Sequence, residues 1–132
     1  MKTRTFHADG SQPQPGEIFV FGSNQAGYHG GGAARAAATQ YGAEFGVSEG
    51  LTGQSYAIPT CDASINPLPL AVIAEKVACF LDFARATPGT RYFVTRIGCG
   101  IAGHRDADIA PMFAAAQLNC SLPDTWALIF KD

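Results

Sequence analysis

The chain has 132 residues, of which 47% are hydrophobic and 15% charged, and its formal net charge is −2. These values are typical of one soluble globular domain spanning residues 1–132, large enough to bury a real core. The sequence has no Lys/Arg cluster, which argues against an extended nucleic-acid surface but leaves room for a single nucleotide end in a pocket. No apolar run approaches membrane-spanning length and no hydrophobic leader follows Met1–Arg4, so we expect a cytoplasmic protein with no membrane partner.

Predicted strands and helices alternate along the chain. The strands are expected at residues 2–8, 17–21, 55–58, 92–97 and 125–130. The helices are expected at residues 33–41, 67–87 and from Asp106 or Asp108 onward. This alternation predicts an α/β domain with a mixed, mostly parallel sheet and helices on both faces, a three-layer α/β/α arrangement.

Prolines and apolar spacing set several of these boundaries. Ile73 and Val77 belong to the helical apolar pattern of 67–87, and Pro67 stands where a first turn tolerates proline. Pro59 is expected to stop the strand that begins at Ser55.

Between the strand at 17–21 and the next helix lies a loop that contains Asn24, His29 and several glycines. The loop glycines are Gly22, Gly27, Gly30, Gly31 and Gly32, and the Ala-rich helix begins at about Ala33. Glycines allow a ligand to approach the backbone closely, and a helix N-terminus presents unpaired N–H groups and the positive end of its dipole. We therefore interpret this loop as a phosphate-binding site rather than a structural turn.

A second glycine-rich loop, Gly98–Gly103, follows the strand at 92–97. Its spacing matches the dinucleotide fingerprint, but Asp124 lies before the next strand rather than at its end, which disfavours a Rossmann domain. The chain also lacks a Walker phosphate loop and a hydrolase nucleophile elbow. Because both glycine loops leave the carboxyl ends of strands, we expect them to meet at one pocket.

Together the two loops resemble those of macrodomains, the ADP-ribose-binding fold. The resemblance rests on Gly22-Ser-Asn24, Gly30-Gly-Gly-Ala-Ala34 and Arg96-Ile-Gly-Cys-Gly-Ile-Ala-Gly103, and it covers about residues 5–130. The form RIGCG is most similar to the branch that contains terminal ADP-ribose protein glycohydrolases and related bacterial and phage proteins. Tyr56–Thr60 and the long helix occur in that branch's order.

The resemblance implies a pyrophosphate held by backbone N–H groups of both loops, which needs no Lys or Arg. It also implies that Asn24 contacts the distal ribose and that Asp9 accepts from the adenine amino group, although Asp9-Gly10 also fits an exposed turn. The implied ligand-binding residues are Asp9, Asn24, Gly30, Gly31, Gly32, Ala33, Thr60, Gly98, Cys99, Gly100, Ile101, Ala102, Gly103 and His104. The expected ligand is ADP-ribose or a conjugate of it, and no cofactor is implied.

The chain departs from this branch at two catalytic positions. The branch's lysine nucleophile is replaced by Cys61 and its assisting acid by Ala102, and neither residue can form the adduct of an amine. A substitute mechanism would use water held by Asn24, with His29 or Asp62 assisting. Cys61 as a nucleophile would need a partner base and a lowered pKa.

Four cysteines are widely spaced: Cys61, Cys79, Cys99 and Cys120. In a reducing compartment we expect free thiols, two of them in the core, and the spacings fit no zinc site, so no metal is expected.

The favoured hypothesis is therefore a module that binds ADP-ribose or a derivative. The alternatives are a hydrolase that removes ADP-ribose from a protein, nucleic-acid or small-molecule conjugate, and a partner-binding domain with a vestigial pocket. The role of Arg96 stays open between pairing with a buried acid and contacting the ligand phosphate.

Overall fold

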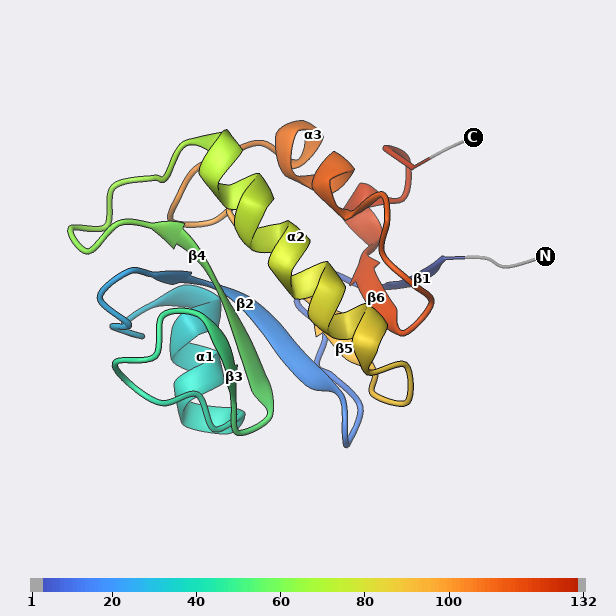
Figure 1. Cartoon of the computed structure of the whole chain (residues 1–132), viewed down its shortest axis with the longest axis horizontal. Coiled ribbons are helices and arrows are strands. Elements are labelled where there is room, and N and C mark those ends of the chain that lie inside the picture. The colour runs from blue at the N-terminus through green and yellow to red at the C-terminus, as the bar shows by residue number, and fades with distance from the viewer. Residues whose placement is uncertain (1–3, 131–132) are drawn as a thin grey trace.

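The computed structural model of the chain describes residues 4–130 (Figure 1). Its strands are β1 (Thr5–His7), β2 (Ile18–Asn24), β3 (Gly50–Thr52), β4 (Ser55–Cys61), β5 (Tyr92–Val94) and β6 (Cys120–Pro123). Its helices are α1 (Gly32–Gln40), α2 (Leu70–Ala86) and α3 (Asp106–Ile109), with 3₁₀ turns at Ala110–Phe113 and Asp124–Trp126. None of these helices combines the length and the apolar character needed to cross a membrane.

The six strands form one sheet in the order β1-β6-β5-β2-β4-β3. All neighbouring strands run parallel except β3, which is antiparallel to β4. In the centre of the sheet, Val20 of β2 pairs with Tyr56 of β4 on one side and with Val94 of β5 on the other. The predicted mixed, mostly parallel sheet is confirmed.

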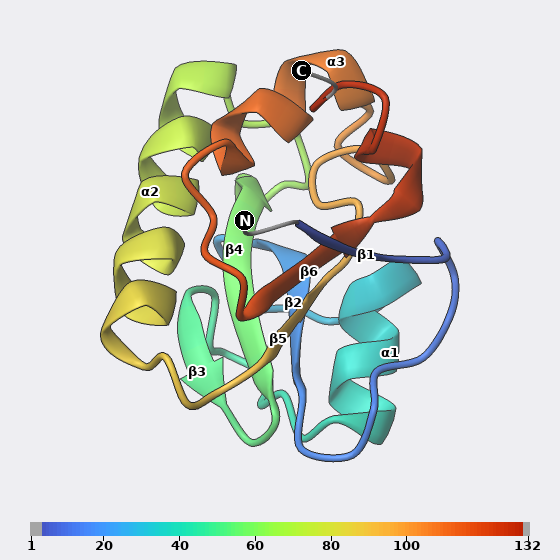
Figure 2. The ribbon, with the colours of Figure 1, turned by 90° about the vertical axis from the view of Figure 1, so that its right-hand side faces the viewer.

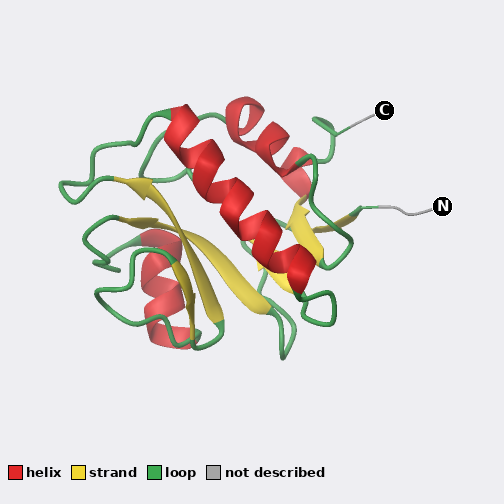
Figure 3. Cartoon of the chain, viewed as in Figure 1, coloured by secondary structure: helices red, strands yellow, loops and turns green. Residues whose placement is uncertain are grey.

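The sheet lies between two helical layers (Figures 2 and 3). Alternate residues of the central strands face opposite layers. Val20, Tyr56 and Val94 belong to a large apolar cluster with α2 and the turn at 110–113, whereas Phe19 and Phe21 pack against the alanines of α1. The chain is therefore a three-layer α/β/α domain, as predicted.

Three predicted strand boundaries are wrong. Strand β2 continues to Asn24 instead of ending at residue 21, so Gly22 and Asn24 belong to the strand and not to the loop. Strand β4 continues through Pro59 to Cys61 instead of stopping before the proline. Proline is tolerated there because the pairing of β4 with β3 ends at Ala57. On that side of β4, no strand lies opposite Pro59, so the missing N–H costs no hydrogen bond of the sheet. Strand β5 ends at Val94, three residues earlier than predicted, because the chain turns directly after its last bond to β2, with the Ile97 N–H donating to the Thr95 carbonyl at 2.7 Å.

The predicted final strand at 125–130 is also wrong. The strand is at Cys120–Pro123, and the apolar stretch that follows is a 3₁₀ helix and turns. Trp126 is fully buried in the α2 layer, whereas Leu128 is 82% exposed. The stretch is apolar because one tryptophan anchors a turn, not because a strand is buried.

The remaining predicted elements have nearby boundaries. Helix α2 begins at Leu70 rather than residue 67, with Pro69 as its N-cap. Helix α3 begins at Asp106, the first of the two predicted starts, and continues as a 3₁₀ turn through Pro111. Strand β1 covers Thr5–His7, and residues 2 and 3 of its predicted range lie outside the described residues.

Candidate functional site

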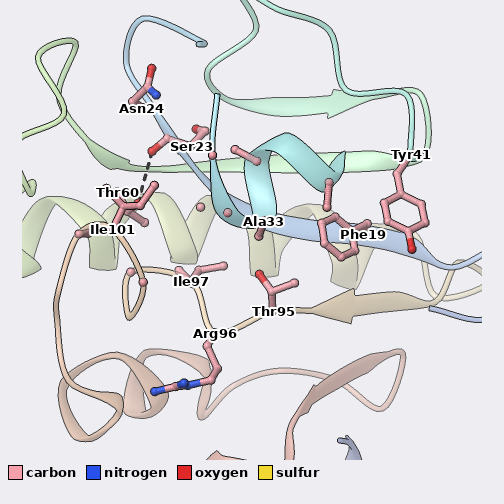
Figure 4. A pocket seen from close by; sticks show the side chains of 18 of the residues that line it. Phe19, Ser23, Asn24, Ala33, Tyr41, Thr60, Thr95, Arg96, Ile97 and Ile101 are labelled. Atoms are coloured by element: carbon pink, nitrogen blue, oxygen red, sulfur yellow. Dashed lines mark hydrogen bonds between the residues drawn. The ribbon is translucent and has the colours of Figure 1, made fainter. Parts of the chain in front are cut away.

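Both glycine loops line one cavity of about 1,100 Å³ (Figure 4). The β2–α1 loop and the start of α1 contribute Gly30, Gly31, Gly32 and Ala33, and the loop after β5 contributes Gly98, Gly100, Ile101 and Ala102. A Cβ atom built on Gly31 would lie 3.6 Å from Cδ1 of Ile101, so the loops are close neighbours. The expectation that the loops meet at one pocket is confirmed.

Backbone N–H groups of both loops are available to a ligand. Within residues 4–130, cavity-lining residues of both loops have N–H groups that donate to no protein acceptor: Gly30, Gly31, Gly32, Ala33, Gly98, Gly100, Ile101 and Ala102. Those of Gly32 and Ala33 belong to the first turn of α1, where the helix dipole also favours an anion. Such groups can bind an anion without a cationic side chain.

Three residues of the predicted second-loop site do not line the cavity. Cys99 N–H donates to the carbonyl of Arg96, and Gly103 N–H donates to that of Gly100. His104 N–H donates to the carbonyl of Gly98, and its ring Nε2 lies 3.0 Å from the carbonyl oxygen of Leu68. These residues shape the turn that presents Gly100, and their direct contact with a ligand stays a prediction.

Asn24 lies at one end of the cavity, near Ser23 and Thr60 (Figure 4). Its side-chain oxygen accepts from the Tyr28 N–H at 3.0 Å, and its Nδ2 donates to the Tyr28 carbonyl at 2.7 Å. The Thr60 hydroxyl donates to the Ser23 carbonyl at 3.3 Å and holds β4 against β2. Asn24 therefore holds the loop that carries Tyr28 in place. The sequence predicted a contact between Asn24 and a ribose but not this structural role.

The two predicted catalytic assistants are not in the cavity. His29 is only 1% exposed, with Nε2 2.9 Å from the Glu44 carbonyl oxygen and its ring edge-on to Phe21. Asp62 caps a tight turn by accepting from the N–H groups of Ser64 and Asn66, both at 2.9 Å. The Asn66 bond contributes most to holding the pKa of Asp62 below its usual range. Neither residue lines the cavity, where the predicted mechanism would need it.

Cys61 lines the cavity at the position of the resembled branch's lysine, but it is not an activated nucleophile. Its side chain is buried, and this burial raises the pKa of the thiol. A protonated thiol is a poor nucleophile. Cys61 and Cys120 are the two buried free thiols, in agreement with the two core cysteines predicted.

Selective alkylation tests this assignment. With iodoacetamide at pH 7.5, we expect the exposed Cys79 to be labelled, because reagent can reach it. We expect Cys61, Cys99 and Cys120 to stay unmodified, since burial raises the pKa of all three, to about 12 for Cys99 and about 11 for Cys120. Peptide mass spectrometry distinguishes the sites, and rapid labelling of Cys61 in the folded protein would contradict this description of the cavity.

Arg96 lines the cavity and pairs with two acids, the partly buried Asp106 and the exposed Asp9. Its contact with a ligand phosphate, the other alternative, stays a prediction. Its Nε and Nη2 donate to the Asp106 carboxylate at 3.0 and 2.7 Å, and its Nη1 lies 3.6 Å from Oδ2 of Asp9. Trp126 Nε1 donates to the same Asp106 carboxylate at 2.6 Å. The Arg96 bond chiefly holds the pKa of Asp106 below its usual range. Asp9 also lines the cavity, so the carboxylate that pairs with Arg96 is accessible from the cavity.

The far part of the cavity is aromatic, and the sequence analysis did not identify it. Phe19, Tyr41 and Phe93 line it, with the Phe19 and Tyr41 rings stacked 4.6 Å apart (Figure 4). His7 stacks on Phe93 at 3.7 Å with Nδ1 2.7 Å from the Ser121 hydroxyl, and burial lowers the pKa of its ring. These four residues come from separate parts of the chain. Within their strands, His7 and Phe93 alternate with residues that face the opposite layer, and this alternation was the sequence signal that could have assigned them to the cavity side.

Comparisons with known proteins establish the fold and nothing finer. No protein-family model matches the chain, and no curated protein matches it either. Among solved structures, a Bacteroides thetaiotaomicron protein of unknown function is similar, with a TM-score of 0.56 at 15% sequence identity. The match covers 93% of this chain and 98% of the other, so the similarity extends over the whole α/β/α domain.

Proposed function

We propose that this protein is a macrodomain-like module that binds ADP-ribose, or a derivative of it, in the cavity between the two glycine loops. The observation that carries the proposal is the set of unpaired N–H groups, from two loops, on residues that line one cavity. A diphosphate is the ligand group that suits such a wall, because several N–H donors can share its charge over two phosphates. The order of the loops and the RIGCG sequence at residues 96–100, after β5, support ADP-ribose as the nucleotide.

The rest of the cavity suits the two nucleoside ends. Asp9 lines it from the β1–β2 loop, where the carboxylate could accept from an amino group of a base, as the resemblance implies. Ser23 and Thr60 lie beside Asn24 at the other end (Figure 4). Their hydroxyls donate to the carbonyls of Ser48 and Ser23 and keep lone pairs that could accept from a ribose hydroxyl.

Binding without turnover is the form of the proposal that the geometry favours. Asn24 is engaged with the Tyr28 backbone, His29 and Asp62 do not line the cavity, and the pKa of the Cys61 thiol is raised. A hydrolase would need a base within hydrogen-bond reach of a water at the anomeric carbon. We further propose a cytoplasmic location, where a reducing environment keeps the four cysteines as the free thiols that the structure contains.

Calorimetric titration with ADP-ribose tests the proposal. We expect saturable binding of one ligand per chain, and unchanged ADP-ribose conjugates after incubation with the protein. Release of ADP-ribose from an ADP-ribosylated protein or DNA, above the level of an Asn24→Ala variant, would favour the hydrolase instead. The absence of any saturable heat at millimolar ligand would favour the vestigial pocket.

A further inference from the structure

Tyr28 is exposed yet held in place. Its side chain is 64% exposed, but both polar groups of its backbone are bonded to the Asn24 side chain. A Cβ atom built on Gly30 would lie 2.3 Å from Cε2 of Tyr28, so the ring lies directly against the Gly30 backbone, where only glycine leaves space for it. Phe45 supports the ring with a centroid distance of 6.0 Å. An aromatic ring that is both exposed and fixed is a preorganised contact surface.

Two further exposed apolar side chains line the same cavity. Ile101 of the second glycine loop is 65% exposed, and Ile65 of the β4–α2 loop is 41% exposed. Ile65 has φ +65°, a conformation that a β-branched residue adopts only at a cost. The turn is held by the Asp62 carboxylate, which accepts from the N–H groups of Ser64 and Asn66. Asp62 thus keeps Ile65 in its strained position at the cavity.

The loops that carry these three side chains add no charge to the cavity. Among the described lining residues, the formally charged ones are Asp9 and Arg96, whose Oδ2 and Nη1 atoms lie 3.6 Å apart. Asp9 belongs to the β1–β2 loop and Arg96 follows β5, whereas Cδ1 of Ile101 lies 3.6 Å from a Cβ atom built on Gly31, in the loop that carries Tyr28. A charged group next to Tyr28 would have no partner there, whereas an uncharged ring would stack on Tyr28 in a part of the cavity that these loops line without charge.

We propose that Tyr28, with Ile65 and Ile101, binds a planar, uncharged ring attached to the terminal ribose of the ligand. This inference rests on the proposed function, because it assumes that the terminal ribose lies next to Asn24. The ring stacks on the Tyr28 face and displaces water from the two isoleucines. The preferred ligand is then an ADP-ribose conjugate with an aromatic group, rather than one with a charged amino-acid side chain.

The test compares two ligands on three proteins by calorimetry. The ligands are ADP-ribose and ADP-ribose with a p-nitrophenyl group on the anomeric oxygen of the terminal ribose. We expect the wild type to bind the aryl conjugate about 5- to 100-fold more tightly, the range for one aromatic stacking contact. Tyr28→Ala should bind both ligands equally, and Tyr28→Phe should keep the preference because stacking needs only the ring. Leu128→Ala, which removes an exposed apolar side chain outside the cavity, should also keep the preference.

Equal affinities in the wild type, or a preference that survives in Tyr28→Ala, would overturn the inference. If ADP-ribose itself fails to bind, the proposed function is wrong, and a second measurement then decides the role of Tyr28. In that measurement, millimolar p-nitrophenyl riboside is added without any diphosphate and the Tyr28 ring resonances are followed by NMR. Saturable shifts in the wild type support the stacking surface, and unchanged resonances exclude it.

Discussion

Substitution of Gly31 by glutamate should reduce the affinity for ADP-ribose by at least ~100-fold, or about 2.8 kcal/mol, while the protein stays folded. Gly31 has φ −156°, an extended conformation open to any residue, and a Cβ atom there would meet nothing nearer than Ile101 Cδ1 at 3.6 Å. The new side chain would therefore enter the cavity without straining the backbone. Its carboxylate would occupy the space in front of the free N–H groups and repel the diphosphate.

Gly89→Glu is the matched control for this experiment. Gly89 lies in the α2–β5 loop, has no positive φ, and has open space around a built Cβ atom. The variant adds the same side chain and charge outside the main cavity, so we expect wild-type affinity in the calorimeter. Wild-type affinity in Gly31→Glu as well would place the diphosphate somewhere other than the two loops.

Substitution of Asp106 by alanine should lower the free energy of unfolding by about 2–3 kcal/mol. The Asp106 carboxylate accepts three hydrogen bonds, two from Arg96 and one from Trp126, whose side chain is fully buried. Without it, the Trp126 Nε1–H stays buried and unpaired, and the Arg96 guanidinium keeps only the longer contact with Asp9. Urea unfolding at pH 7 measures the loss, which is a large share of the stability of a domain of this size.

Asp108→Ala is the control, because Asp108 pairs with the exposed Arg105 and should contribute less than about 0.5 kcal/mol. Asp106→Asn should fall between the two, since the amide oxygen can still accept from Trp126. A loss in Asp106→Ala no larger than that in Asp108→Ala would show that the Arg96–Asp106–Trp126 cluster does not stabilise the fold.

The same carboxylate makes stability depend on pH. Because the Arg96 bond lowers the folded-state pKa of Asp106 below its usual value of 3.8, the carboxylate stabilises the fold above that pH. The contribution is lost as the pH falls from about 4 through the lowered folded-state pKa. The difference in unfolding free energy between the wild type and Asp106→Asn should therefore be full at pH 7 and shrink below pH 4. A difference that stays constant down to pH 2 would contradict this role.

Local patterns predicted the elements that position the cavity. The run before Gly22, the alanine-rich helix and the second glycine loop each carry their signal within a few residues, and parallel topology places their ends together. The strand β6 was misplaced because Trp126 and the residues after it are apolar for tertiary reasons, whereas β6 itself is short and includes Ser121. No local rule separates an anchoring tryptophan from a strand.

Side-chain roles within the site were less predictable. The amide of Asn24 could equally contact a ligand or its own loop, and only the folded backbone brings the Tyr28 carbonyl to it. His29 lies in a glycine loop, yet its ring turns toward Phe21 and Glu44 instead of the cavity. Such choices depend on contacts between residues far apart in the sequence, which residue spacing does not encode.

Amide NMR of the ¹⁵N-labelled protein during titration with ADP-ribose tests the diphosphate site most directly. The account predicts saturable shifts at Gly30, Gly31, Gly32, Ala33, Gly98, Gly100, Ile101 and Ala102, cavity-lining residues whose N–H groups have no protein acceptor. Gly89 and its neighbours in the α2–β5 loop should not move. Shifts confined to one loop, or to residues outside the cavity, would contradict the claim that both loops hold one diphosphate.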